Sequence, residues 1–185
     1  MIWWANHLSP EKSVWANTVT AVRQDRDQAA EEQQSRNRKE IAMTREEIKS
    51  LFLQQIDCSQ VVAEQFAEEL QMDKDMLRKM SACFGGGMQC GETCGAVTGA
   101  LMVIGLKYGH YKEDDLDQKV IMMKKVAEFK EKFAEKYPSC LCRDLLGHDI
   151  SKPGEFDKVL EENLMMDFCP GVVETAIEIL KELGC

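Results

Sequence analysis

The sequence predicts an all-α protein, folded as an irregular or orthogonal bundle of about seven helices. Two observations carry this prediction. From Thr44 onward, apolar residues recur at the three- and four-residue spacing of amphipathic helices, and no segment shows the two-residue alternation of a half-buried strand. The 185 residues are 44% hydrophobic, which is enough for one sizeable core.

The chain divides near its first capping signal. Residues 23–40 are almost continuously polar, which is typical of a solvated helix or a disordered tail. Acidic and basic residues balance over residues 1–43, so the net charge of −9 falls on the remainder. Thr44 and Glu47 have the spacing of a capping box. We therefore expect a polar N-terminal extension over residues 1–43, either disordered or a single helix, followed by one helical domain over residues 44–185.

The first half of the domain contains helices with recognisable caps. Ser59 and Asp73 are candidate N-caps of two successive helices. A glycine run at 85–87 then breaks the chain, and residues 92–108 are rich in Gly and Ala, which predicts a buried helix that a neighbouring backbone or a bound group approaches closely. The residues expected to be buried on the two capped helices are Val62, Phe66, Leu70, Met76, Leu77, Met80 and Phe84.

The second half contains one long helix and several short ones. The long helix is predicted to run from about Leu116 to Pro138, a short turn over 142–146 ends at Gly147, and another helix covers 155–166. Cys169 is the expected N-cap of the last helix, with Pro170 at its first position. The expected buried residues of the long and last helices are Leu116, Val120, Met123, Ala127, Phe133, Tyr137, Val173, Ala176, Ile177, Leu180 and Leu183.

Four of the eight cysteines fall at predicted helix starts. A helix N-terminus presents unpaired N–H groups and a partial positive charge, which lowers the pKa of a thiol and favours the thiolate. If the four helix starts converge, their sulfurs should cluster, and the site would hold disulfides, a disulfide beside a reactive pair, or a thiolate-bound metal ion or iron–sulfur centre. Cys94 is expected to be the most activated. The four candidate catalytic or metal-ligating residues are Cys58, Cys94, Cys142 and Cys169.

Other candidates are weaker. Cys90 and Cys140 lie close in sequence to members of the set and are auxiliary thiols that could resolve an oxidised partner, whereas Cys83 is expected to pack on its helix and Cys185 is a terminal thiol. The chain lacks the paired C-x₂-C knuckles of a zinc ribbon or ferredoxin. His148 could ligate a metal or carry a proton, although a loop histidine is the commoner outcome.

Two further features have ordinary structural interpretations. The run Gly85-Gly86-Gly87 lacks the lysine and hydroxyl residue of a phosphate loop, so we expect a tight turn beside Cys94. The pairs Met122-Met123 and Met165-Met166 stand at helical positions and are expected to fill the core.

Composition excludes several classes of function. The balance of 32 acidic against 23 basic residues argues against a nucleic-acid binder, which needs clustered cations. The longest apolar run, over residues 96–106, is too short to cross a bilayer, so we expect no direct membrane insertion. The N-terminus lacks the pattern of a secretory signal. We expect a cytoplasmic protein with mostly reduced thiols.

Several motifs in order resemble a known family. They are Cys58-Ser59-Gln60, Phe84-Gly85-Gly86-Gly87-Met88, Gly91-x-x-Cys94-Gly95-Ala96-x-x-Gly99-Ala100, Cys142-Arg143-x-Leu145-Leu146-Gly147 and Cys169-Pro170. Over about residues 44–183 the chain resembles the redox-active proteins named for the pattern C_GCAxxG_C_C. The resemblance implies a small helical protein with four signature cysteines, often associated with transporter genes. The label writes Gly before Cys in its central motif, whereas this chain has Cys94-Gly95-Ala96.

Together these observations predict a cytoplasmic redox protein, either a thiol-based oxidoreductase or an electron carrier. Its four signature cysteines would exchange disulfides or bind a metal or iron–sulfur centre, and a redox partner protein or a transporter would be its partner. The alternative is a non-catalytic accessory module of a transporter or electron-transfer complex, with an exposed apolar patch beside the site. A third reading is a structural protein with inert buried cysteines.

Overall fold

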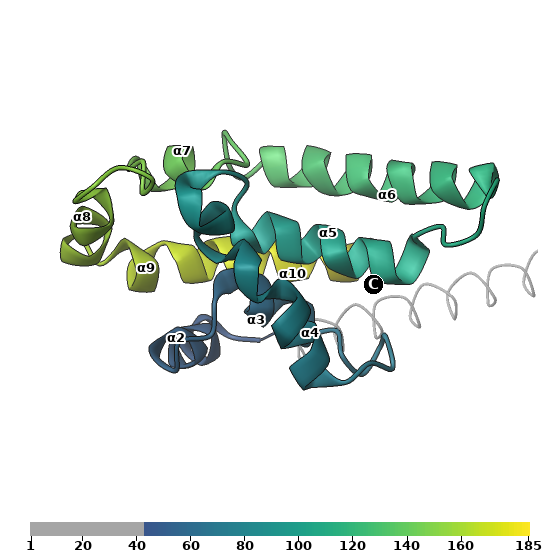
Figure 1. Ribbon diagram of the computed structural model, residues 1–185, viewed down its shortest axis with the longest axis horizontal. Helices are drawn as coiled ribbons and strands as arrows, with labels where there is room; N and C mark the ends of the chain where they lie inside the picture. The colour runs from purple at the N-terminus through teal and green to yellow at the C-terminus, as the bar shows by residue number, and fades with distance from the viewer. Residues whose placement is uncertain (1–42) are drawn as a thin grey trace, which may run out of the picture. The chain divides into compact units, whose positions relative to one another are not determined.

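The computed structural model describes residues 43–185, and within them the protein is all-α, as the sequence predicts (Figure 1). In this part of the chain, extended backbone pairs only at one isolated antiparallel bridge, between Thr93 and Leu141. The expected polar extension over residues 1–43 lies outside the described residues, apart from Met43. No helix of the described region is long and apolar enough to span a membrane.

The first three helices of the described region are held by side-chain caps. The helix α2 (Arg45–Leu53) begins with the predicted capping box, in which the backbone N–H of Thr44 donates to the carboxylate of Glu47 at 2.8 Å. The N-cap of α3 (Cys58–Glu64) is Asp57 and not the predicted Ser59, whose hydroxyl instead donates to a backbone carbonyl at the end of α4. The helix α4 (Lys74–Ser81) is capped by Asp73, as predicted.

The glycine run forms a compact turn between α4 and the next long helix. It comprises a 3₁₀ turn, η1 (Ala82–Phe84), and a wider turn, η2 (Gly87–Gly91). Gly86, Gly87 and Gly91 all have positive φ, a conformation that glycine adopts at little cost. The expected tight turn is therefore present.

Three long helices form the centre of the described region. They are α5 (Gly95–Tyr108), α6 (Leu116–Ala134) and α10 (Cys169–Glu182). The helix α5 begins three residues later than predicted because Cys94 is its N-cap. Figure 1 shows α5 and α10 starting toward the same end of this bundle, with α6 running back beside them. The helix α3 packs across α5, where Gly99 allows the two backbones to approach closely.

The predicted core is correct for α3 and α10 but partly wrong for α4 and α6. On α4, Met76 and Met80 are about half exposed, because the side that packs inward carries Leu77 and Ser81. On α6, the predicted stripe is displaced around the helix, so its first members are exposed. The residues of α6 that pack inward are Met122, Val126, Phe129 and Phe133, whereas Leu116, Val120, Met123 and Ala127 are exposed.

Three short helices lie near the starts of α5 and α10 (Figure 1). The helix α7 (Cys142–Leu146) ends at Gly147 in a left-handed conformation, as predicted. The single helix expected over residues 155–166 is wrong, because Asn163 adopts a left-handed conformation with φ of 55° and divides it into α8 (Glu155–Glu161) and α9 (Leu164–Asp167). This break turns α9 toward the start of α10, which it contacts.

Candidate functional site

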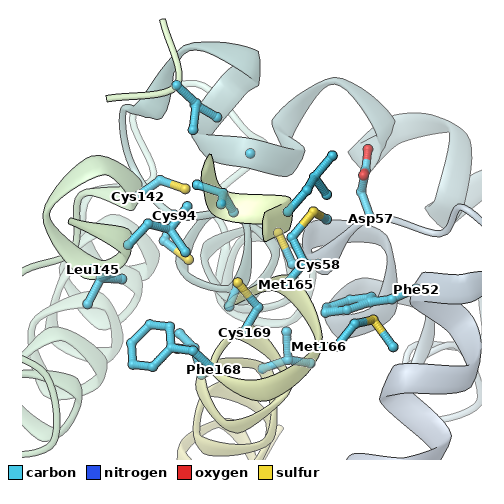
Figure 2. A pocket seen from close by; sticks show the side chains of 18 of the residues that line it. Phe52, Asp57, Cys58, Cys94, Cys142, Leu145, Met165, Met166, Phe168 and Cys169 are labelled. Atoms are coloured by element: carbon cyan, nitrogen blue, oxygen red, sulfur yellow. The ribbon is translucent and has the colours of Figure 1, made fainter. Parts of the chain in front are cut away.

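The starts of α3, α5, α7 and α10 surround one cavity of about 460 Å³. All four signature cysteines line it, and Figure 2 shows their sulfurs gathered around the same space. The outermost two, Cys58 and Cys169, lie 111 residues apart in the chain, so the shared site depends on the fold. The four residues are Cys58, Cys94, Cys142 and Cys169, and each is a free thiol.

The sulfur of Cys58 is the best supplied with hydrogen-bond donors. Cys58 is the first residue of α3, and the backbone N–H groups of Gly86 and Ser59 donate to its sulfur. Gly95 makes room for this sulfur, since a Cβ at that position would lie 2.3 Å from it. Such donors stabilise a thiolate, because they point partial positive charge at the sulfur.

Cys94 and Cys142 are held beside each other by backbone pairing. The N–H of Cys94 donates to the carbonyl of Cys140 at 2.8 Å, and the N–H of Cys142 donates to the carbonyl of Glu92 at 2.7 Å. These bonds flank the isolated bridge, so the start of α5 and the start of α7 form one unit. An ion pair between Glu92 and Arg143 joins the same two segments.

The glycine turn brings the backbone against this unit. A Cβ at Gly87 would lie 2.7 Å from the Cβ of Cys142, and the φ of Gly87 is 61°. The close approach is to Cys142 and not, as the sequence suggested, to Cys94. Gly85 packs in the same way against Asp57, since a Cβ at Gly85 would lie 2.5 Å from Cγ of the Asp57 carboxyl group.

Cys169 completes the set from the opposite wall. It is the first residue of α10 and not the expected N-cap, which is Phe168, and Pro170 follows it at the second position. The ring of Phe168 meets that of Tyr137 edge to face, with centroids 6.1 Å apart. This packing anchors the start of α10 against the segment that follows α6.

Burial raises the pKa of all four thiols, which contradicts the expectation of lowered values. The pKa of Cys142 rises to about 12, and that of Cys94, expected to be the most activated, rises well above its ordinary value. In each case the main cause is removal of the sulfur from water. A negative charge on Cys58 would raise the pKa of each of the other three further. The free-energy cost of desolvating a thiolate outweighs the stabilisation it gains from a helix N-terminus, because α3 and α7 are short and the walls are apolar.

The apolar walls were not predicted as part of the site. Met165 and Met166, expected to be core residues, line the cavity from α9. Three side chains on the walls are also exposed, with 72% of Leu53, 45% of Phe156 and 51% of Leu160 accessible to solvent. The remaining apolar side chains of the walls are Phe52, Ile56, Ala96, Leu145, Leu146, Ile150, Val159, Phe168, Val172 and Val173.

The weaker candidates lie elsewhere. Cys90 and Cys140 do not line the cavity, and the thiol of Cys90 donates to the carbonyl of Gly87 at 3.4 Å. Cys83 is exposed, so its expected packing is wrong. His148 also lies outside the lining, with its two ring nitrogens paired to Glu155 and Glu162, a contact that raises its pKa.

The four cavity thiols are not arranged as a metal site. Within residues 43–185, no group of three or more His, Cys, Asp or Glu side chains is placed to hold a metal ion. The four sulfurs line one cavity without meeting the geometry of such a site.

Comparison with known protein families identifies a match over most of the domain. The family model described as "Putative redox-active protein (C_GCAxxG_C_C)" matches residues 56–183, which is more than half of the chain and includes the whole cavity-lining set from Ile56 onward. No curated protein and no solved structure matches the chain. With all four signature cysteines inside the matched region, the chain belongs to the C_GCAxxG_C_C family.

Proposed function

We propose that the protein is a thiol–disulfide redox centre in which pocket cysteines are oxidised and reduced in pairs. The observation that carries the proposal is the convergence of four free thiols from four helix starts on one apolar cavity. The family's redox character supports the same chemistry. Inert structural cysteines would have no need of a shared cavity.

Cys58 is the proposed attacking thiol. It has more backbone N–H groups directed at its sulfur than the other three, so its thiolate is the one best stabilised in this apolar setting. Cys94 is the proposed resolving thiol, because its neighbour Gly95 lies directly against the Cys58 sulfur. Cys142 and Cys169 then form the second pair.

The reaction with a disulfide-bearing partner balances in two steps. The Cys58 sulfur, after losing its proton to solvent, attacks one sulfur of the partner's disulfide, and the other partner sulfur leaves with the bonding electrons and takes up a proton. Cys94 then loses its proton and attacks the Cys58 sulfur. A Cys58–Cys94 bond forms, and the first partner sulfur leaves as a thiol, so one disulfide is reduced and two thiols are oxidised.

Mass spectrometry of trapped disulfides tests this assignment. Reduced full-length protein is treated with one equivalent of 4,4′-dithiodipyridine under nitrogen, and the remaining thiols are blocked with N-ethylmaleimide before digestion. We expect a peptide pair joined through Cys58 and Cys94. Cys58→Ser should abolish it, whereas Cys83→Ser, which changes an exposed thiol, should leave it intact.

A metal-bearing centre would give a different result. Elemental analysis and an absorption spectrum of the anaerobically purified chain provide the comparison. Stoichiometric iron or zinc that disappears from Cys58→Ser protein, with no disulfide trapped in the wild type, would replace the thiol proposal with a ligand role for the same residues.

The cellular compartment and the redox partner are further parts of the proposal. We propose a reducing compartment, the cytoplasm, because the centre must begin as free thiols. A redox partner protein or a transporter would supply or take the electrons. The exposed side chains of Leu53, Phe156 and Leu160 favour a second candidate function, that of a non-catalytic accessory module docked on such a complex. In that case Cys58→Ser would leave the activity of the complex unchanged.

A further inference from the structure

The cavity has the size and character of a binding site for a small apolar molecule. Its volume of about 460 Å³ falls in the range of ligand pockets in proteins. Among the described residues that line it, the polar side chains besides the four cysteines are Gln55, Asp57 and Asn163. A charged substrate would lose its water here and gain few partners.

We propose that this cavity binds a quinone, which oxidises a pair of its cysteines to a disulfide and leaves as the hydroquinone. The inference rests on the proposed thiol–disulfide function and names the class of electron acceptor. It follows from the combination of thiols and apolar walls within one cavity. A quinone is neutral in both its oxidised and its reduced form, and apart from its two oxygens its ring presents apolar surface.

The reaction balances without leaving charge in the cavity. Two cysteine S–H bonds break and one S–S bond forms, which releases two electrons and two protons. The quinone takes up both electrons and both protons and ends with two O–H groups on its ring. Because burial holds the protons on the thiols, an acceptor that takes protons together with electrons suits this site better than one that takes electrons alone.

The walls also provide for the ring's oxygens and for its entry. Asp57 places a carboxyl group on the wall, and burial raises its pKa, so it keeps a proton for donation to a quinone carbonyl more readily than an exposed carboxyl does. Phe52 and Phe168 provide aromatic surface within the cavity (Figure 2). The exposed side chains of Leu53, Phe156 and Leu160 border the same space and present apolar surface to an incoming ring or its tail.

Duroquinone is a suitable probe, because methyl groups on the four ring carbons that carry no oxygen prevent thiols from adding there. Reduced full-length protein is mixed with it under nitrogen, and quinone loss is followed by absorbance while remaining thiols are counted. We expect a rate that saturates with quinone concentration and one quinone reduced for every two thiols lost. The double variant Cys58→Ser/Cys142→Ser, which removes one thiol from each proposed pair, should bind duroquinone in equilibrium dialysis without reducing it.

A matched pair of surface variants locates the site. Leu160→Glu places a charge at the cavity and should raise the half-saturating quinone concentration about tenfold. Leu116→Glu makes the same change at an exposed leucine of α6 that does not line the cavity, and it should leave the value unchanged. Circular dichroism of both variants verifies that each is folded.

Three outcomes would overturn the inference. Closure of the Cys58–Cys94 disulfide by dithiodipyridine without saturable reduction of duroquinone would reject the quinone and leave the thiol function standing. Binding without any electron transfer in the wild type would identify a site for a redox-inert apolar ligand. Equal effects of Leu160→Glu and Leu116→Glu would place the reaction outside the cavity.

Discussion

The sulfur of Cys58 occupies the space that a side chain at Gly95 would fill. A Cβ at residue 95 would lie 2.3 Å from that sulfur and 3.0 Å from the backbone carbonyl oxygen of Phe84. The missing side chain therefore allows α3, α5 and the glycine turn to meet at one sulfur. Two cysteines of the cavity, Cys58 and Cys94, are brought together through this contact.

Alanine at Gly95 should displace the Cys58 sulfur and destabilise the protein. We expect a loss of about 1–3 kcal/mol in the free energy of unfolding, because the contact is shorter than any real Cβ contact and the backbone offers no room. Gly105→Ala in the same helix is the control. Nothing lies within 4 Å of a Cβ there, so it should stabilise by about 0.5–1 kcal/mol. Equal changes in the free energy of urea unfolding for the two variants would show that residue 95 does not require glycine.

Among the four cavity thiols, Cys58 should be alkylated first as the pH is raised. Its backbone donors stabilise the thiolate, whereas burial raises the pKa of Cys94 well above its ordinary value. Exposed Cys83 should react faster than any of them because reagent reaches it freely. Peptide mass spectrometry after brief labelling of reduced protein gives the order. Labelling of Cys94 before Cys58 would mean that the helix dipole, not burial, controls reactivity.

The placement of the four cysteines at helix starts could be predicted because the signals that begin and end a helix are local. Thr44 and Asp73 cap the helices that follow them, Gly147 ends α7, and Pro170 marks the start of α10. The gathering of four helix starts could be anticipated only from their shared cysteine, since nothing local brings distant segments together. The family resemblance carried the same four residues.

The direction of the thiol pKa shifts could not be predicted in the same way. A helix start is visible in sequence, but burial depends on walls contributed by α8 and α9. Asn163, whose left-handed backbone divides these two helices, gives no strong breaking signal in the sequence. On α6, apolar residues lie on more than one side, so periodicity alone selected Leu116 and Val120 over the buried Phe129.

The reduced protein should lose stability above pH 9 because its cavity thiols stay protonated only while it is folded. The unfolded chain releases the proton of Cys142 near pH 9.0, whereas the folded chain holds it to about 12. The stabilisation is therefore complete below pH 9 and is lost through that window, at up to about 1.4 kcal/mol per pH unit. Urea unfolding between pH 8 and 10.5 should show a shallower decline for Cys142→Ser. The decline of Cys83→Ser should match the wild type, and identical slopes in all three proteins would contradict the buried-thiol account.

His148 should make the helix α8, which carries part of the cavity wall, sensitive to pH near neutrality. Its ring nitrogens lie 3.1 Å from Glu155 and 3.2 Å from Glu162, at the two ends of α8, and hydrogen bonds to these carboxylates raise its pKa above 6.5. Lys158 also pairs with Glu155, so the carboxylate stays charged throughout. A raised pKa stabilises the folded state below pH 6.5, and this contribution is lost as the pH rises through the pKa of the folded state.

Amide hydrogen exchange in α8, corrected for intrinsic rates, should therefore speed up from pH 6 to 8.5. His148→Gln should remove this dependence, and His110→Gln, at an exposed residue outside the cavity lining, should keep it. The same dependence in all three proteins would mean that another group controls α8.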